Sequence, residues 1–156
     1  MENTLDLNED WIEHTGQEVG DLLRHDSAEA TESGNQRVYV IDSDPDTLLS
    51  LSELLSREGY PTEACSEPEK GLAYVERTQP ALVIASDEVR GLKRLEILDR
   101  IRQVSPSSRV IILSASVGWE IHEEVLRRGG SQVVSRRAQA STILGIVEQL
   151  LVRGKR

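Results

Sequence analysis

Residues 81–91, ALVIASDEVRG, begin as a continuous apolar run and then reach Ser86, Asp87 and Glu88. The apolar part is typical of a buried parallel strand, and the polar residues mark the point where the chain leaves the sheet. Ligands of open α/β sheets bind at that carboxyl edge. A carboxylate there can act as a nucleophile, whereas a serine hydroxyl is weak without an adjacent base. These three residues are therefore the first candidates for chemistry.

Other catalytic arrangements find no support in the sequence. His14 and His25 lie near the acidic N-terminus, and His122 falls within a predicted helix. We find no Ser-His-Asp or Cys-His arrangement and no metal-ligand spacing. Gly129-Gly130 is more simply the end of a helix than a phosphate-binding loop. These features argue against a small α/β enzyme, and we expect no enzymatic activity.

Five short apolar or β-branched segments predict strands, and residues with helical spacing follow each of them. The strand segments are residues 37–42, 61–65, 81–86, 109–116 and 132–135. Near-continuous apolar strands that alternate with helices predict an α/β fold with a doubly wound parallel sheet covered on both faces.

Cap residues mark two of the predicted helices. Asp44 followed by Pro45 predicts a helix start, and Gly59 predicts its end. Ser66 and Glu69 have the spacing of a capping box and predict the next helix start. The other helices are predicted from apolar residues at helical spacing: Leu95, Leu98 and Ile101; Ile121 and Val125; and Ile143, Ile146, Val147 and Leu150.

The net charge of −9 is confined to one end of the 156-residue chain. Residues 1–36 contain ten acidic residues against one basic residue, Arg24, so they carry −9 and the remaining charges cancel. This pattern predicts an acidic N-terminal extension at 1–36, a folded domain at 37–152 and a short basic tail at 153–156. Because the extension and nucleic acid are both anionic, we expect no nucleic-acid partner.

Residues 8–24 of the extension have an amphipathic pattern. Ile12, Val19 and Leu22 fall on one helical face, with Trp11 beside it. Two interpretations stay open: a helix docked on its own domain, or a helix offered to a partner.

The sequence also bears on location. No apolar run approaches the ~18 residues that span a bilayer, and the acidic N-terminus is unlike a signal peptide. Cys65 is the single cysteine, which rules out an intrachain disulfide. We therefore expect a cytoplasmic protein without a membrane partner.

Residues 37–152 resemble the receiver domains of two-component response regulators. The resemblance rests on four stretches, VYVIDSDPDTLLSLSELLSREGY, LVIAS, VIILSAS and LRRGGSQVVSRRA. It implies a flavodoxin-like (βα)5 fold. It also implies a pocket at the carboxyl edge of the sheet, where a kinase phosphorylates one aspartate.

The pocket departs from the family pattern at its acidic positions. The two acids that hold Mg²⁺ in the family align with Asp42 and Ser43, and the phosphoacceptor aspartate aligns with Ser86. Asp44 is also often acidic in the family but is better explained as a helix N-cap, so Asp42 and Asp44 are weak metal candidates. Mg²⁺ usually needs one or two carboxylates plus phosphate. We therefore expect weak or absent Mg²⁺ binding and no cofactor.

The positions that transmit the signal in the family are partly retained. Ser114 keeps the switch hydroxyl, but the aromatic residue that couples to it aligns with Val133, which has no ring to rotate. The phosphate-binding lysine aligns with Arg136, which we expect to pair with Asp42. The following cis-proline aligns with Arg137, so we expect a trans bond there.

These departures predict a degenerate receiver, or pseudo-receiver, in a two-component or phosphorelay pathway. It would act by phosphorylation-independent protein–protein interaction, through the fourth helix, fifth strand and fifth helix. The sequence specifies neither the partner nor the oligomeric state.

The alternative is a divergent but active receiver, phosphorylated at Asp87 or through another kinase chemistry at Ser86. Strand side chains alternate between faces, so Asp87 is expected to point away from the pocket, in a solvated loop with Glu88. A bulge or an early turn would be needed to bring its carboxylate back.

Overall fold

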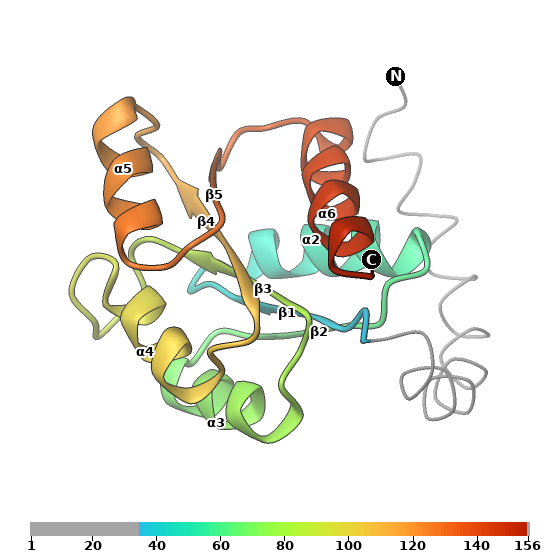
Figure 1. Cartoon of the computed structure of the whole chain (residues 1–156), viewed down its shortest axis with the longest axis horizontal. Coiled ribbons are helices and arrows are strands. Elements are labelled where there is room, and N and C mark those ends of the chain that lie inside the picture. The colour runs from blue at the N-terminus through green and yellow to red at the C-terminus, as the bar shows by residue number, and fades with distance from the viewer. Residues whose placement is uncertain (1–34, 156) are drawn as a thin grey trace.

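Five strands alternate with five helices in a computed structural model that describes residues 35–155 (Figure 1). The amphipathic pattern at 8–24 lies outside the described residues. In chain order the elements are β1 Val38–Ile41, α2 Pro45–Arg57, β2 Thr62–Cys65, α3 Pro68–Thr78, β3 Leu82–Ser86, α4 Glu96–Val104, β4 Arg109–Ser114, α5 Trp119–Arg127, β5 Gln132–Ser135 and α6 Ala140–Lys155.

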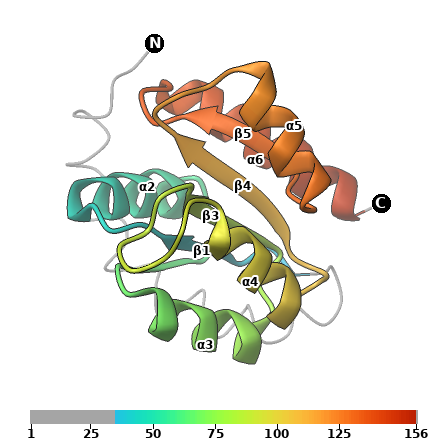
Figure 2. The ribbon, with the colours of Figure 1, turned by 90° about the vertical axis from the view of Figure 1, so that its left-hand side faces the viewer.

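The strands form one sheet in the order β2-β1-β3-β4-β5, and every neighbouring pair is parallel. Helices α2 and α6 cover one face, whereas α3, α4 and α5 cover the other (Figure 2). This is the predicted doubly wound, flavodoxin-like (βα)5 fold, and it brings the carboxyl ends of β1, β3, β4 and β5 to one edge.

Alternation along the strands builds two separate cores. In β1, Val38 and Val40 pack beneath α2 and α6, while Tyr39 and Ile41 pack against the opposite layer. Because β1, β3 and β4 are buried on both faces, their apolar residues run almost without interruption, whereas the edge strand β2 has an exposed Glu63.

Some predicted boundaries differ from the structure. Asp44 is the N-cap of α2, as predicted, with Pro45 at its first position. The capping box at Ser66 is wrong, because α3 begins at Pro68 and its N-cap is Glu67 without a side-chain cap bond. Proline fixes a helical φ at the first position, which explains a helix start without that box. Helix α6 continues through Lys155 and takes in most of the predicted tail.

A polar network closes the amino edge of the sheet. Gln79, at a left-handed φ of 49°, donates from Nε2 to the carbonyl oxygen of Val104 at 2.9 Å and accepts at Oε1 from Ser105 Oγ at 3.0 Å. The buried Ser105 and Ser108 hydroxyls are 2.7 Å apart, and Ser108 donates to the carbonyl of Pro80. Asn35 donates to the Gln79 carbonyl at 2.7 Å, which ties the described N-terminus to this network.

We predict that Ser108→Ala lowers the free energy of unfolding by about 1–3 kcal/mol, because it removes the donor to a carbonyl and the partner of a buried hydroxyl. Urea denaturation measures this loss. Ser107→Ala is the matched control, since Ser107 is the exposed neighbour, and its effect should stay within about 0.5 kcal/mol. Equal effects of the two substitutions would contradict a stabilising role for the network.

Candidate functional site at the carboxyl edge

The carboxyl ends of the parallel strands and the loops that follow them surround one pocket. Its walls come from the β1–α2, β3–α4, β4–α5 and β5–α6 connections. The lining residues are Asp42, Ser43, Asp44, Pro45, Ser86, Asp87, Glu88, Arg90, Arg94, Ala115, Ser116 and Arg136. Ser114 is buried and reaches the pocket through a hydrogen bond to Asp87. Val133 instead lies in the core beneath α3, α4 and α5.

Asp42 and Arg136 form the predicted ion pair. Arg136 Nη2 lies 2.8 Å from Asp42 Oδ2, and the Asp42 side chain is only 3% exposed. Asp42 Oδ1 accepts from the backbone N–H of Asp44 at 2.9 Å. The Oδ2 atom has no hydrogen-bond partner, so the short contact to Arg136 is a charge pair without hydrogen-bond geometry. The guanidinium is thus the counter-charge of this buried carboxylate.

Arg136 also connects the pocket to α2. Its Nη1 donates to Ser86 Oγ at 3.2 Å, and its Nη2 donates to Thr47 Oγ1 at 3.2 Å. The Thr47 hydroxyl in turn donates to Asp44 Oδ2 at 2.7 Å. This hydroxyl holds the pKa of the Asp44 carboxyl below its ordinary value, and Arg136 adds a smaller effect in the same direction.

Ser86 ends β3 with its hydroxyl folded onto the following turn. Its Oγ donates to the carbonyl of Glu88 at 2.9 Å and accepts from the Glu88 N–H at 3.1 Å. Its remaining contact is the cationic Arg136, which cannot take a proton. In the described part of the chain, the contacts of Ser86 include no general base to activate the hydroxyl.

Asp87 corrects the expectation of a carboxylate in a solvated loop. The residue is 5% exposed and lines the pocket, whereas Glu88 is exposed as expected. Its N–H still donates to the Leu113 carbonyl at 2.9 Å, and its own carbonyl accepts from Leu95 at 2.8 Å. The backbone therefore stays beside β4 for one residue after β3 and then turns, which places this carboxylate over the end of β4.

A second ion pair neutralises Asp87. Arg94 Nε and Nη2 lie 3.1 and 3.0 Å from Asp87 Oδ2, and the Ser114 hydroxyl donates to the same atom at 2.9 Å. Sequence reasoning missed Arg94. The sequence does place a basic residue seven positions after Asp87. It could not single out Arg94, because Arg90 and Lys93 in the same loop are also basic.

The remaining site predictions concern conformation and metal. None of the described peptide bonds is cis, which agrees with the trans bond expected before Arg137. The described residues contain no group of three His, Cys, Asp or Glu side chains that could hold a metal, and the buried oxygen of Asp42 faces a guanidinium.

Comparison with known families and sequences places the fold and pocket in context. The profile of the response regulator receiver domain matches residues 38–148, which is more than half of the chain. The chain is 28% identical over 81 residues to sporulation initiation phosphotransferase F of Bacillus subtilis (strain 168), a match that covers 52% of this chain and 65% of that protein. It is 27% identical over 116 residues to the transcriptional activator protein ExaE of Pseudomonas putida, covering 73% and 54%. The chain thus spans less than two thirds of both relatives.

Solved structures give the same fold. The receiver domain of NtrX from Brucella abortus matches with a TM-score of 0.68 and 25% identity, covering 73% of this chain and 97% of that one. A CheY-like receiver domain protein from Methanospirillum hungatei JF-1 matches with a TM-score of 0.69 and 22% identity, covering 78% and 98%. No helix within residues 35–155 is both long and apolar enough for a bilayer span.

We predict that Arg136→Ala lowers the free energy of unfolding by about 3 kcal/mol, because it leaves the buried Asp42 carboxylate without a counter-charge. Chemical denaturation measures the loss. Arg137→Ala, at the exposed neighbour, should change stability by less than about 0.5 kcal/mol. Adding Asp42→Asn to Arg136→Ala should restore most of the loss, since the uncompensated charge is gone. Failure of this rescue would show that Arg136 stabilises the domain by packing and not by charge.

Proposed function

Because this chain belongs to the response regulator receiver domain family, we propose that it is a degenerate receiver that signals through protein–protein contacts without being phosphorylated. The observation that carries the proposal is the state of the pocket. Two arginines of the chain itself, Arg136 and Arg94, are already paired with its buried carboxylates, and a serine ends β3.

Ser86 is a poor acceptor for the chemistry of the family. Formation of an acyl phosphate requires a carboxylate nucleophile. The Ser86 hydroxyl is not one, and it is hydrogen-bonded to the backbone of Glu88 and to the guanidinium of Arg136. The guanidinium of Arg136 spans Asp42, Ser86 and Thr47 and so lies between the groups that metal and phosphate would contact. We infer a module with no enzymatic activity and no Mg²⁺ cofactor.

One observation favours the alternative, an active receiver phosphorylated at Asp87, because that carboxylate lines the pocket. Against it, Oδ2 of Asp87 already accepts from Arg94 and from Ser114, so phosphorylation through that oxygen would have to displace both donors.

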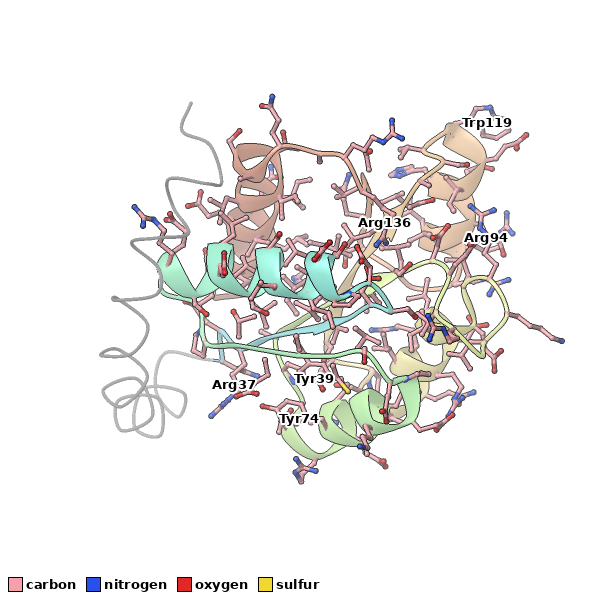
Figure 3. The ribbon with its side chains drawn as sticks, turned by 180° about the vertical axis from the view of Figure 1, so that it is seen from behind. Arg37, Tyr39, Tyr74, Arg94, Trp119 and Arg136 are labelled. Atoms are coloured by element: carbon pink, nitrogen blue, oxygen red, sulfur yellow. The ribbon has the colours of Figure 1, made fainter. Side chains whose placement is uncertain are left out.

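The proposed contact surface is the face formed by α5, β5 and α6. Trp119 begins α5 and is 70% exposed, projecting from the outer end of that helix (Figure 3). Val117 and Leu126 are also exposed large apolar residues of this region. Exposed aromatic residues with apolar neighbours are typical anchors of protein–protein interfaces.

We predict that acetyl phosphate and Mg²⁺ give no phosphorylated adduct, because a serine ends β3 and the buried carboxylates Asp42 and Asp87 are each paired with an arginine. Intact-mass spectrometry at neutral pH measures this. A receiver domain that retains all the pocket carboxylates, treated in parallel, checks the phosphodonor. A stoichiometric adduct that peptide mapping places on Asp87 would overturn the proposal in favour of the alternative.

We further predict that neither Mg²⁺ nor beryllofluoride, a phosphoryl mimic, shifts the melting temperature. Ser43→Asp combined with Ser86→Asp should destabilise the metal-free protein by restoring a repulsive carboxylate cluster, and Mg²⁺ should recover part of that loss. Differential scanning calorimetry measures both effects. Ser43→Asn with Ser86→Asn is the matched control, since it changes size without charge and should show no Mg²⁺ response. Stabilisation of the unmodified protein by several degrees would mean that its pocket still binds the ligands of a switch.

A further inference from the structure

A groove lies between α2 and α6. These two helices cover the opposite face of the sheet from α5 (Figures 1 and 2). Its volume is about 450 Å³. Apolar side chains form much of its lining and polar ones complete it: Leu51, Leu54, Leu113, Ala138, Ala140 and Ile143, with Asp46, Thr47, Ser50 and Arg136. The two alanines at the entry of α6 are small, so the space facing α2 stays open. A groove of this size and polarity accepts one or two large apolar side chains.

We propose that residues 11–23 of this chain dock in the groove between α2 and α6. The segment has the required chemistry, because Trp11, Ile12, Val19 and Leu22 supply large apolar side chains at helical spacing.

The tether is long enough to reach the groove. Residues 24–34 connect the segment to Asn35, which is anchored at the amino edge of the sheet by its bond to Gln79. Fully extended, these residues reach roughly 35 Å, whereas the four residues of β1 separate the two edges by roughly 13 Å. A linker of this kind gives an effective concentration on the order of millimolar, so a weak contact suffices for docking.

The consequence is a covered α2 face. A partner that approaches α2 must displace residues 11–23, whereas the exposed Trp119 region on the other layer stays accessible. This internal contact does not depend on whether the pocket accepts phosphate, so it can be tested separately from the proposed function.

Tryptophan fluorescence of the full chain tests the docking. The chain contains two tryptophans, and Trp119→Phe leaves Trp11 as the single reporter. In that background we expect acrylamide to quench Trp11 about twofold less than in the same chain carrying Ile12→Asp, which removes an apolar contact of the segment without changing the domain. Equal quenching of the two chains would overturn the proposal.

Two substitutions on α6 locate the contact. Ala140→Leu fills the groove and should raise Trp11 quenching to the level of Ile12→Asp, whereas Ser141→Leu, at an exposed neighbour that does not line the groove, should leave it unchanged. Circular dichroism confirms that both variants are folded. If Trp11 of the Trp119→Phe chain becomes more strongly quenched by acrylamide on dilution, the segment docks on a second copy of the chain. If the two α6 variants change the quenching equally, the segment binds elsewhere. Either result would overturn the proposal.

Discussion

Neutralisation of buried carboxylates at the carboxyl edge is the constraint that organises this molecule. The parallel topology brings Asp42 and Asp87 into a poorly solvated pocket, where an uncompensated charge costs several kcal/mol. Each therefore needs a cation nearby. Arg136 follows β5, so its pair with Asp42 joins two connections that are distant in sequence. Arg94 lies in the same β3–α4 connection as Asp87, so the second pair fixes the shape of that one loop.

An arginine at position 136 suits a pocket in which Ser43 and Ser86 stand at two of the family's acidic positions. A compact ammonium serves best where several carboxylates converge on one point, whereas a planar guanidinium can contact separate partners. Arg136 does this with Asp42, Ser86 and Thr47. Because Ser86 is neutral, a single carboxylate remains for this cation. The arginine and the serine at these two positions are therefore compatible in one pocket.

The sequence predicted the fold and one ion pair because those depend on robust patterns. Apolar runs that alternate with helices specify a parallel sheet, and the resemblance aligned Arg136 opposite Asp42. It failed at Asp87, because strand alternation assumes that the sheet geometry ends with the strand. A single extra backbone bond to Leu113 overrode that rule. It also failed at Ser66, where Pro68 determines the helix start. Both errors concern the residues just outside an element, where tertiary contacts outweigh local pattern.

Arg136 links the pocket to the groove between α2 and α6, since it lines both. Its Nη2 contacts Thr47, which lines the groove, and Asp42, which lines the pocket. A change at the groove that moves the guanidinium therefore changes its contact with Asp42, and a change at the pocket changes its contact with Thr47. Anything bound in the groove with a preference for one arrangement of Arg136 is therefore coupled to the ion pair, and the coupling is reciprocal. Arg136 is thus the one residue of the described chain shown to line both sites, and its substitution is expected to affect the two together.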